Sequence, residues 1–388
     1  MTYDFDEIIP RRGTHCVKHD GMEPYFGTND LIPMWVADMD FRSPDFVMNA
    51  IRERCAHEVL GYAAPSQNYY ETMLSWLLNH YHISALREEI HYIPGIVAGI
   101  AFVIQSLTQR GDRILVLNPV YPPFLNLPLS DGRELSCSPL KTVNGRFEID
   151  FPDLERRAEG CRLMILSNPH NPGGIVWSPS DLRRIADICH RHHIVVIADE
   201  IHADLTLPGY HHTSFSTVSP EALEQSITFV APSKTFNIAG LGSSVCYIHN
   251  PELRRRLYGY LDGYELANGN IFAFVGAEAA FRHGEEWLRQ LLAYLSGNVT
   301  LLRDFLACEM PQVKAVLPEA SFLPWLDFSG CGYAHGETRR RMLEVARVAL
   351  NDGTAFGGSA YENCFRLNIG CPRSLLQEVL QRLASAMK

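Results

Sequence analysis

The chain has 388 residues, a formal net charge of −10, 46% hydrophobic residues and 20% charged residues. These values are typical of a globular protein with one large and one smaller domain, because so long a chain exceeds a single simple core. The acidic balance argues against a nucleic-acid binder and against a partner of anionic membranes.

The start of the chain predicts a protein without a secretory signal, because MTYDFDE is acidic and lacks a basic start and an apolar stretch. The most membrane-like window, residues 93–104, contains a proline and two glycines. It falls short of the roughly 20 apolar residues that span a bilayer, so we expect a loop that enters a buried helix. Ten cysteines without a CxxC pair suit reduced thiols, and we therefore expect a cytoplasmic protein.

The first strong helix signal is Ser43-Pro44, which predicts Ser43 as the N-cap and Pro44 as the first helical position. A second helix is expected to open at Ser178-Pro179. Between and after these signals lie nearly uninterrupted runs of Val, Ile and Leu. The runs predict strands at 114–117, 163–166, 194–198, 227–230 and 245–248. Such strands indicate a mostly parallel sheet covered by helices on both faces, which is a doubly wound α/β domain.

The pattern changes after about Gly284. A long helix at 287–306 is followed by strand-like pieces at 321–328 and 364–369 and by a final helix from Ser374. We therefore predict three parts: residues 1–42 as an N-terminal segment that joins the small domain, residues 43–284 as the large domain, and residues 285–388 as a small α+β domain.

Chemically informative residues follow four of the predicted strands. They are Tyr121 in NPVY, Asn171 in NPHNPGG (168–174), Asp199 and His202 in DEIH, and Lys234 in PSKTFN. Ligands of open parallel sheets bind beyond the carboxyl ends of the strands, so these side chains are expected around one crevice. Each motif alone is weak, since such a lysine is often merely solvated and prolines with glycines often form only a turn.

Together these side chains suit an aldehyde cofactor that carries a pyridine nitrogen. A lysine can form a Schiff base with the aldehyde, and a carboxylate can keep the nitrogen protonated. The turn at Pro94-Gly95, which leads into a helix, could hold a phosphate. The His-rich run 190–193 lacks metal-site spacing and lies at a predicted helix end, so we predict no metal there.

The combined motifs resemble the class I/II aminotransferase superfamily of pyridoxal-phosphate (PLP) enzymes, fold type I. WVADMDF (35–41), DEIH and FRLNIGCPR (365–373) resemble, more narrowly, its MalY/PatB group of cystathionine β-lyases, or C–S lyases. The resemblance runs from about residue 30 to the end. It implies PLP as cofactor, with residues 43–284 as the PLP-binding domain, and an amino acid as substrate.

The resemblance also implies roles for individual residues. Lys234 would be the Schiff-base lysine and the proton shuttle, Asp199 the partner of the pyridine nitrogen, and Tyr121 the ring that stacks on the cofactor. Asn171 and His202 would lie at the phenolic oxygen, and Ser233 with the amides near Val97 and Ala98 would bind the phosphate. Arg366 would bind the substrate carboxylate, and Asn171 would also contact the substrate. Tyr62 would reach the phosphate of the neighbouring subunit of a homodimer.

Two residues depart from the pattern of many aminotransferases. His202 stands where many have tyrosine, and Gly242 stands where many have a phosphate-binding arginine. Both departures suit the lyase branch. They leave two alternatives for the phosphate: either Ser233 and backbone amides suffice, or another cation compensates.

The predicted function is α,β-elimination on L-cystathionine or related S-substituted cysteines, which gives a thiol, pyruvate and ammonia. The alternative is an aminotransferase, which would use the same residues but return the proton to the cofactor. A third possibility is a regulatory protein that docks a transcription factor. An intact set of Lys234, Asp199 and Asn171 argues for retained chemistry.

Overall fold

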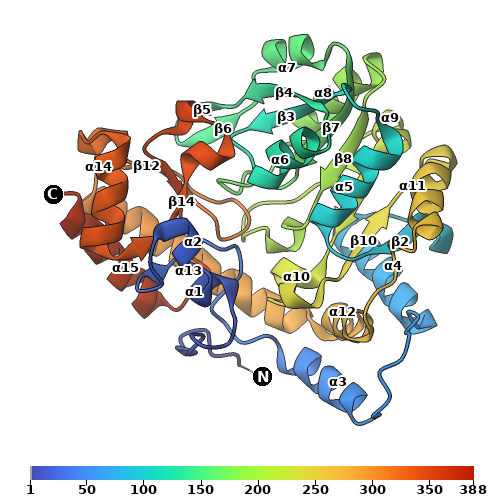
Figure 1. The fold of residues 1–388 in the computed structure, drawn as a ribbon, viewed down its shortest axis with the longest axis horizontal. Helices are drawn as coiled ribbons and strands as arrows, with labels where there is room; N and C mark the ends of the chain where they lie inside the picture. Colours follow the sequence, from blue (N-terminus) through green and yellow to red (C-terminus); the bar gives the residue numbers. More distant parts are fainter. Residues whose placement is uncertain (1) are drawn as a thin grey trace.

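A seven-stranded sheet forms the centre of the large part of the molecule in the computed structural model, which describes residues 2–388 (Figure 1). Met1 of the predicted N-terminal segment lies outside the described residues. The strands, in spatial order, are β2 (Ile90–Ile93), β10 (Ser244–Tyr247), β9 (Ser226–Val230), β8 (Val195–Asp199), β7 (Cys161–Ser167), β3 (Arg113–Asn118) and β4 (Glu134–Pro139). The last five run parallel, and β10 is antiparallel to both of its neighbours. All five predicted strands are confirmed.

Helices cover both faces of this sheet, as the continuous apolar strands predicted. In β3, Ile114 and Val116 belong to one buried cluster, whereas Leu115 and Leu117 belong to another. The first cluster includes side chains of α5 (Ile96–Leu107), α6 (Pro122–Ser130) and α11 (Pro251–Gly263). The second includes side chains of α7 (Phe151–Ala158), α8 (Pro179–Arg191) and α9 (Pro220–Glu224). The predicted α/β doubly wound fold is therefore confirmed.

Two predicted helix starts had different outcomes. Ser178 caps α8, because its Oγ accepts a hydrogen bond from the Asp181 N–H. The prediction for Ser43 was wrong: α3 (Asp45–Cys55) has Pro44 as its N-cap and no side-chain cap. The Ser43 hydroxyl instead donates to the carbonyl of Asn237, so a tertiary contact replaces the local one. The window at 93–104 does form a turn and the buried helix α5.

Three more helices complete the large part, and a small hairpin lies beside it. The helices are α4 (Gln67–Tyr81), α10 (Pro232–Thr235) and α12 (Ile271–His283), and the hairpin strands are β5 (Lys141–Val143) and β6 (Arg146–Glu148). Helices α4 and α12 bury side chains in a third cluster, which also contains residues of the C-terminal helices.

The C-terminal residues build a second, four-stranded antiparallel sheet with helices packed on it. Its elements are α13 (Glu285–Glu309), β11 (Lys314–Val316), β12 (Trp325–Asp327), α14 (His335–Arg340), β14 (Asn351–Asp352), β15 (Cys364–Arg366) and α15 (Arg373–Ala386). The piece predicted at 321–328 is a strand only at its end, because Ser321 has a φ of 72° and Pro324 follows it. Figure 1 shows α14 and α15 at the end of the molecule opposite α11.

The N-terminal segment lies against this C-terminal part. It contains α1 (Val17–Asp20), α2 (Glu23–Phe26) and β1 (Ile32–Pro33), and β1 pairs in parallel with β13 (Val348–Ala349). The division at residues 42 and 284 stays a prediction. Within residues 2–388, no helix combines the length and apolarity that crossing a bilayer requires.

Candidate active site

The side chains that follow the parallel strands meet around one cavity of about 410 Å³. Asp199 is the last residue of β8, Tyr121 follows β3, and Lys234 lies in α10 just after β9. Eight of the predicted site residues line this cavity: Val97, Ala98, Tyr121, Asn171, Asp199, His202, Ser233 and Lys234. Arg366 and Tyr62 are not among its lining residues.

Asp199 is a buried carboxyl group with little to compensate its charge. Its Oδ1 accepts one hydrogen bond, from the Ile201 N–H at 3.1 Å. Burial raises the pKa of Asp199 to about 7, although the neighbouring Lys234 ammonium opposes this shift. A protonated pyridine nitrogen would supply the missing cation, so the carboxyl group fits the predicted cofactor.

Lys234 is poised as a nucleophile. Its Nζ donates a hydrogen bond to the carbonyl oxygen of Ala37 at 2.7 Å. Burial lowers the pKa of Lys234 to about 8, with Asp38 and Asp199 opposing the shift and Arg366 adding to it. About a tenth of the amine is therefore uncharged at pH 7, far more than for an ordinary lysine, and attack on an aldehyde requires this form.

His202 and Asn171 add neutral hydrogen-bonding groups to the cavity. Burial lowers the pKa of His202 to about 3, so its ring is uncharged near neutral pH, and its buried Nδ1 has no partner among the described residues. The side-chain oxygen of Asn171 accepts from Arg366 Nη1 at 3.1 Å, which leaves the amide NH₂ as the donor. Tyr121 is held by its backbone N–H, which donates to the Asn171 carbonyl at 3.0 Å.

The N-terminus of α5 forms one end of the cavity and matches the predicted phosphate site. Gly95 precedes this helix with a φ of 113°, a conformation that favours glycine. The N–H groups of Ile96, Val97 and Ala98 lie in the first turn, where a helix offers no internal acceptor. Among the lining residues, all within the described part of the chain, Lys234 is the one cationic side chain. The geometry thus favours backbone amides and Ser233 over a compensating cation for a phosphate.

Gly242, the position of the missing arginine, lies close to this turn. It has a φ of 62°, and a Cβ atom there would lie 3.8 Å from the Pro94 carbonyl oxygen. The backbone conformation therefore favours glycine, and a longer side chain would be strained.

Arg366 lies behind Asn171 as a buried cation with neutral partners. Its Nη2 donates to Trp35 O at 3.0 Å and to Asn351 Oδ1 at 2.6 Å. Its Nε has no partner within residues 2–388, and burial lowers the pKa of Arg366 to about 10. A buried guanidinium without a carboxylate partner fits the predicted role of Arg366 at a substrate carboxylate.

Tyr62 lies apart from these residues. It belongs to the segment between α3 and α4, and its side chain is fully exposed in the single chain. The cavity of the same chain therefore does not use it, and the role expected for it requires a neighbouring subunit.

Sequence reasoning did not identify the backbone of residues 35–41 as part of the site. Ala37 lines the cavity, and a second cavity of about 970 Å³ also reaches Lys234 and extends along Met39 to the N-terminal segment. The WVADMDF motif was the available signal, but a carbonyl that accepts a hydrogen bond leaves no mark in residue type.

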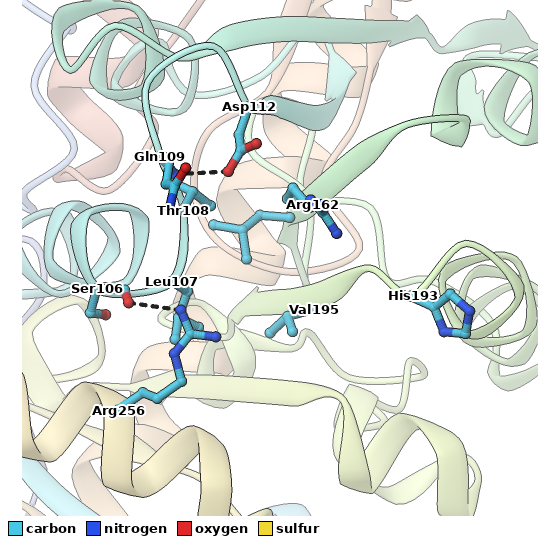
Figure 2. Close-up of a pocket in the computed structure, with 10 residues that line it drawn as sticks. Ser106, Leu107, Thr108, Gln109, Asp112, Arg162, His193, Val195 and Arg256 are labelled. Atoms are coloured by element: carbon cyan, nitrogen blue, oxygen red, sulfur yellow. Dashed lines mark hydrogen bonds between the residues drawn. The ribbon is translucent and has the colours of Figure 1, made fainter.

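Another cavity, of about 460 Å³, lies near the amino ends of the inner strands β7 and β8 (Figure 2). It includes Arg162 and Val195, which lie at the starts of β7 and β8, and Arg256 of α11. Asp199 and Lys234 lie at or beyond the carboxyl ends of their strands, so this cavity is separate from the candidate site. Within residues 2–388, no group of three His, Cys, Asp or Glu side chains is arranged to hold a metal ion.

The profile of the family "Aminotransferase class I and II" matches residues 29–383. The chain belongs to this family. It is 39% identical over 386 residues to cystathionine beta-lyase PatB of Bacillus subtilis (strain 168), covering 99% of this chain and 100% of that protein. It is 28% identical to protein MalY of Escherichia coli (strain K12), covering 100% and 99% of the two chains.

A solved structure of this family has the same fold. The PLP-bound C–S lyase from Staphylococcus hominis superposes with a TM-score of 0.93 and 34% identity, over 100% of this chain and 98% of that one. The resemblance to the MalY/PatB group within the class I and II family is thus confirmed.

Proposed function

We propose that this protein is a PLP-dependent carbon–sulfur β-lyase that cleaves L-cystathionine or related S-substituted cysteines. The observation that carries the proposal is the pairing of Lys234 and Asp199 in one cavity, in a chain with full-length similarity to a cystathionine beta-lyase. Arg366 supports an amino-acid substrate, because its buried guanidinium lacks a carboxylate partner in the described chain.

The residues present fit the cofactor. Asp199 would hold the pyridine nitrogen, Tyr121 would cover the ring, and Asn171 with His202 would bind the phenolic oxygen. Ser233 and the amides of Val97 and Ala98 would bind the phosphate at the start of α5. When bound, PLP supplies an electron-accepting ring conjugated to the substrate's Cα.

The protein's own groups then carry the proton and orient the substrate. Arg366 binds the α-carboxylate and thereby points the Cα–H bond toward Lys234. The Lys234 amine takes the Cα proton, the Cβ–S bond breaks, and the sulfur leaves as a thiolate with the bonding electron pair. Addition of water to the remaining three-carbon unit gives pyruvate and ammonia.

We also propose a homodimer with shared sites. Between α3 and α4, the side chains of Val59, Leu60 and Tyr62 are 65%, 61% and 109% exposed. A contiguous apolar segment of this kind supports burial against another subunit, and Tyr62 would there contact the phosphate of the neighbouring site. The cytoplasm is the proposed compartment, since the ten cysteines are unpaired in this structure.

The test compares elimination with amino transfer. The purified protein, loaded with PLP, is incubated with L-cystathionine, with L-cysteine, and with an amino donor plus a 2-oxo acid. We expect thiol and pyruvate in equal amounts from cystathionine and little new amino acid from the third mixture. Dominant amino transfer would replace the lyase with the aminotransferase.

Lys234→Ala is the matching variant. It should lose the visible absorption of the cofactor–lysine adduct and pyruvate formation, because no other cationic side chain lines the described cavity. Arg255→Ala, which removes an exposed pair with Glu252 on α11, serves as control. Pyruvate formation by Lys234→Ala at the control's rate would contradict the assignment.

A further inference from the structure

Residues 35–41, here called the strap, contact both Lys234, which lines the cavity, and Arg366, which lies behind Asn171. The carbonyl of Ala37 accepts from Lys234 Nζ at 2.7 Å, and the carbonyl of Trp35 accepts from Arg366 Nη2 at 3.0 Å. Lys234 and Arg366 come from α10 and β15, so the strap bridges the large and C-terminal parts of the chain.

Two asparagines fasten the strap on either side. Asn237, three residues after Lys234, donates to the carbonyls of Met39 and Phe41 at 2.9 and 2.8 Å. Asn368, two residues after Arg366, donates to the carbonyls of residues 36 and 38 at 2.6 and 2.7 Å. These contacts fix the strap to both site segments.

A cluster of charges holds the strap from the N-terminal segment. Lys18 is fully buried, and its Nζ lies 2.7 Å from Asp40 Oδ2 and 3.2 Å from the Asp38 carbonyl. Arg11 places Nη1 2.7 Å from Asp40 Oδ1 and Nη2 2.7 Å from Asp38 Oδ2. Asp40 also has His19 at 3.6 Å.

The cations of this cluster strongly affect the ionisation of Asp40. Burial would raise the pKa of Asp40, but Lys18, His19 and Arg11 hold it well below the ordinary range of a carboxyl group. A buried ion pair contributes less to net stability than to fixing one arrangement, because desolvation offsets much of the attraction. This cluster holds Asp38 and Asp40, which follow Ala37 closely in the strap.

We propose that Lys18 and Arg11 are positioning residues, which fix the strap through Asp40 and Asp38 so that the Ala37 and Trp35 carbonyls orient Lys234 and Arg366. The proposal rests on the proposed function for the reaction it serves. The charged groups around the lysine amine are Asp38 on the strap, Asp199 on β8 and Arg366 on β15. Displacement of the strap would move the Asp38 carboxylate away from the Lys234 amine. It would also remove the Ala37 carbonyl as the hydrogen-bond acceptor of that amine.

The main test is the charge-neutral double variant Lys18→Met/Asp40→Leu, which avoids an unpaired buried charge. Arg11→Lys is the second variant, because it keeps the charge but cannot bridge both carboxylates as the guanidinium does. Arg255→Gln/Glu252→Gln removes an exposed pair and is the matched control.

The first readout is the pH midpoint of the visible absorption of the PLP–lysine adduct, which needs no turnover. We expect it to fall by about half a pH unit or more in the double variant, since the Asp38 carboxylate and Ala37 carbonyl leave the cation. Arg11→Lys should shift it less. We expect kcat/KM for cystathionine to fall about tenfold to a hundredfold in the double variant.

A folded, PLP-loaded double variant with the midpoint and kcat/KM of the control overturns the proposal. If the double variant does not fold, Arg11→Lys decides: a shifted midpoint supports the proposal, and a wild-type midpoint overturns it. A shifted midpoint in a protein that releases no thiol from cystathionine or from other S-substituted cysteines would leave the positioning role standing and reject the lyase.

Discussion

Asp199 and Lys234 illustrate how burial tunes two groups of one site. Burial raises the pKa of the carboxyl group to about 7 and lowers that of the amine to about 8, so both titrate near neutral pH. In water the two values would lie several units apart. The cavity thus holds a carboxyl group that could pair with a protonated pyridine nitrogen and an amine that could bond to an aldehyde.

The Asp199 carboxyl group should make the stability of the cofactor-free protein depend on pH. Its pKa is higher in the folded state than in the unfolded state, so the folded protein binds the extra proton between about pH 4 and pH 7. The contribution of Asp199 to the unfolding free energy is therefore present below this window and is lost as the pH rises through it.

Denaturant unfolding of cofactor-free wild type and Asp199→Asn at pH 5 and pH 8 isolates this contribution. We subtract the unfolding free energy of the variant from that of wild type at each pH. This difference should be a few kcal/mol lower at pH 8 than at pH 5, which roughly corresponds to the pKa shift of Asp199. Opposite changes from groups such as His202, whose pKa is lowered, cancel in the difference. An equal difference at both pH values would contradict the buried, poorly compensated carboxyl group.

Arg366→Lys tests the substrate-binding role proposed for Arg366. Lysine keeps the charge but cannot form the two parallel bonds of a guanidinium with a carboxylate. We expect KM for cystathionine to rise by about tenfold to a hundredfold, with a smaller change in kcat. Arg382→Lys on α15, which pairs with Glu378 at the surface, is the control. An unchanged KM in steady-state assays would assign the carboxylate to another group.

At the scale of residues, side-chain types and their positions after strands were enough to predict most of the cavity. The cavity gathers Lys234, Asp199, Asn171 and Tyr121 because each follows a parallel strand, which the sequence pattern predicted. The acceptor of Lys234 could not be predicted in this way. It is a backbone carbonyl 197 residues away in sequence, and backbone carbonyls are common to all residues.

At the scale of elements, the turn at Gly95 and the first turn of α5 form the anion-binding end of the cavity. The positive φ of Gly95 lets the chain reverse from β2 into the helix with its N–H groups toward the cavity. This main-chain geometry supports the proposal that backbone amides bind the phosphate, a role that would not require an arginine at Gly242.

Gly95→Ala should weaken cofactor binding. The substitution strains a backbone conformation that L-residues rarely adopt, at a cost of about 1–3 kcal/mol, and tilts the amides of the first turn. We expect the dissociation constant for PLP to rise about tenfold, as for the loss of one charge-assisted hydrogen bond. The measurement is titration of the cofactor-free protein with PLP.

Gly111→Ala is the matched control for that prediction. Gly111 has a positive φ, of 87°, and like Gly95 it has open space around a Cβ atom. It lies in the turn before the amino end of β3, away from the cavity. Its variant should lose similar stability and keep its affinity for PLP. Equal affinity losses in the two variants would show general destabilisation instead of a local effect.

Local signals predicted elements well where tertiary contacts did not compete. Ser178 caps α8 as expected, whereas Ser43 binds the carbonyl of Asn237, 194 residues away. The strand expected from residue 321 begins only at Trp325, because Ser321 adopts a positive φ. In both failures, distant contacts or backbone geometry outweighed a local preference.

At the scale of the whole molecule, a substitution in the exposed segment around Leu60 tests the proposed homodimer. Leu60→Asp places a charge in the proposed interface, and burying an unpaired charge is costly. We expect the dimer dissociation constant to rise by about tenfold or more, with loss of bound PLP, measured by light scattering and absorbance.

Val345→Asp is the control for this prediction, because Val345 is 56% exposed in the C-terminal part beside α14. It should leave both the mass and the PLP content unchanged. A wild-type dimer in the Leu60→Asp variant would remove this segment from the interface.

Long-range assembly was the part that sequence could not supply. The α/β class and the positions of five strands follow from the apolar runs, but the approach of Trp35 to Arg366 joins residues 331 positions apart. The buried cluster of Lys18, Arg11 and Asp40 is equally non-local, and charged residues near a chain end would ordinarily be assigned to the surface.

The register of β8 against β7 has a consequence for how this scaffold can change. Asp199 lies opposite Ser167 in the sheet, and successive strand residues face alternate helix layers, so Asp199 shares the α5 face with Ile197. A shift of the β8 register by one residue would turn the Asp199 carboxyl group away from the cavity. It would also move each apolar side chain of the strand to the opposite face of the sheet. An insertion in β8 would therefore disrupt the packing of the core and misplace Asp199 at the same time. We expect such insertions to abolish both folding and activity.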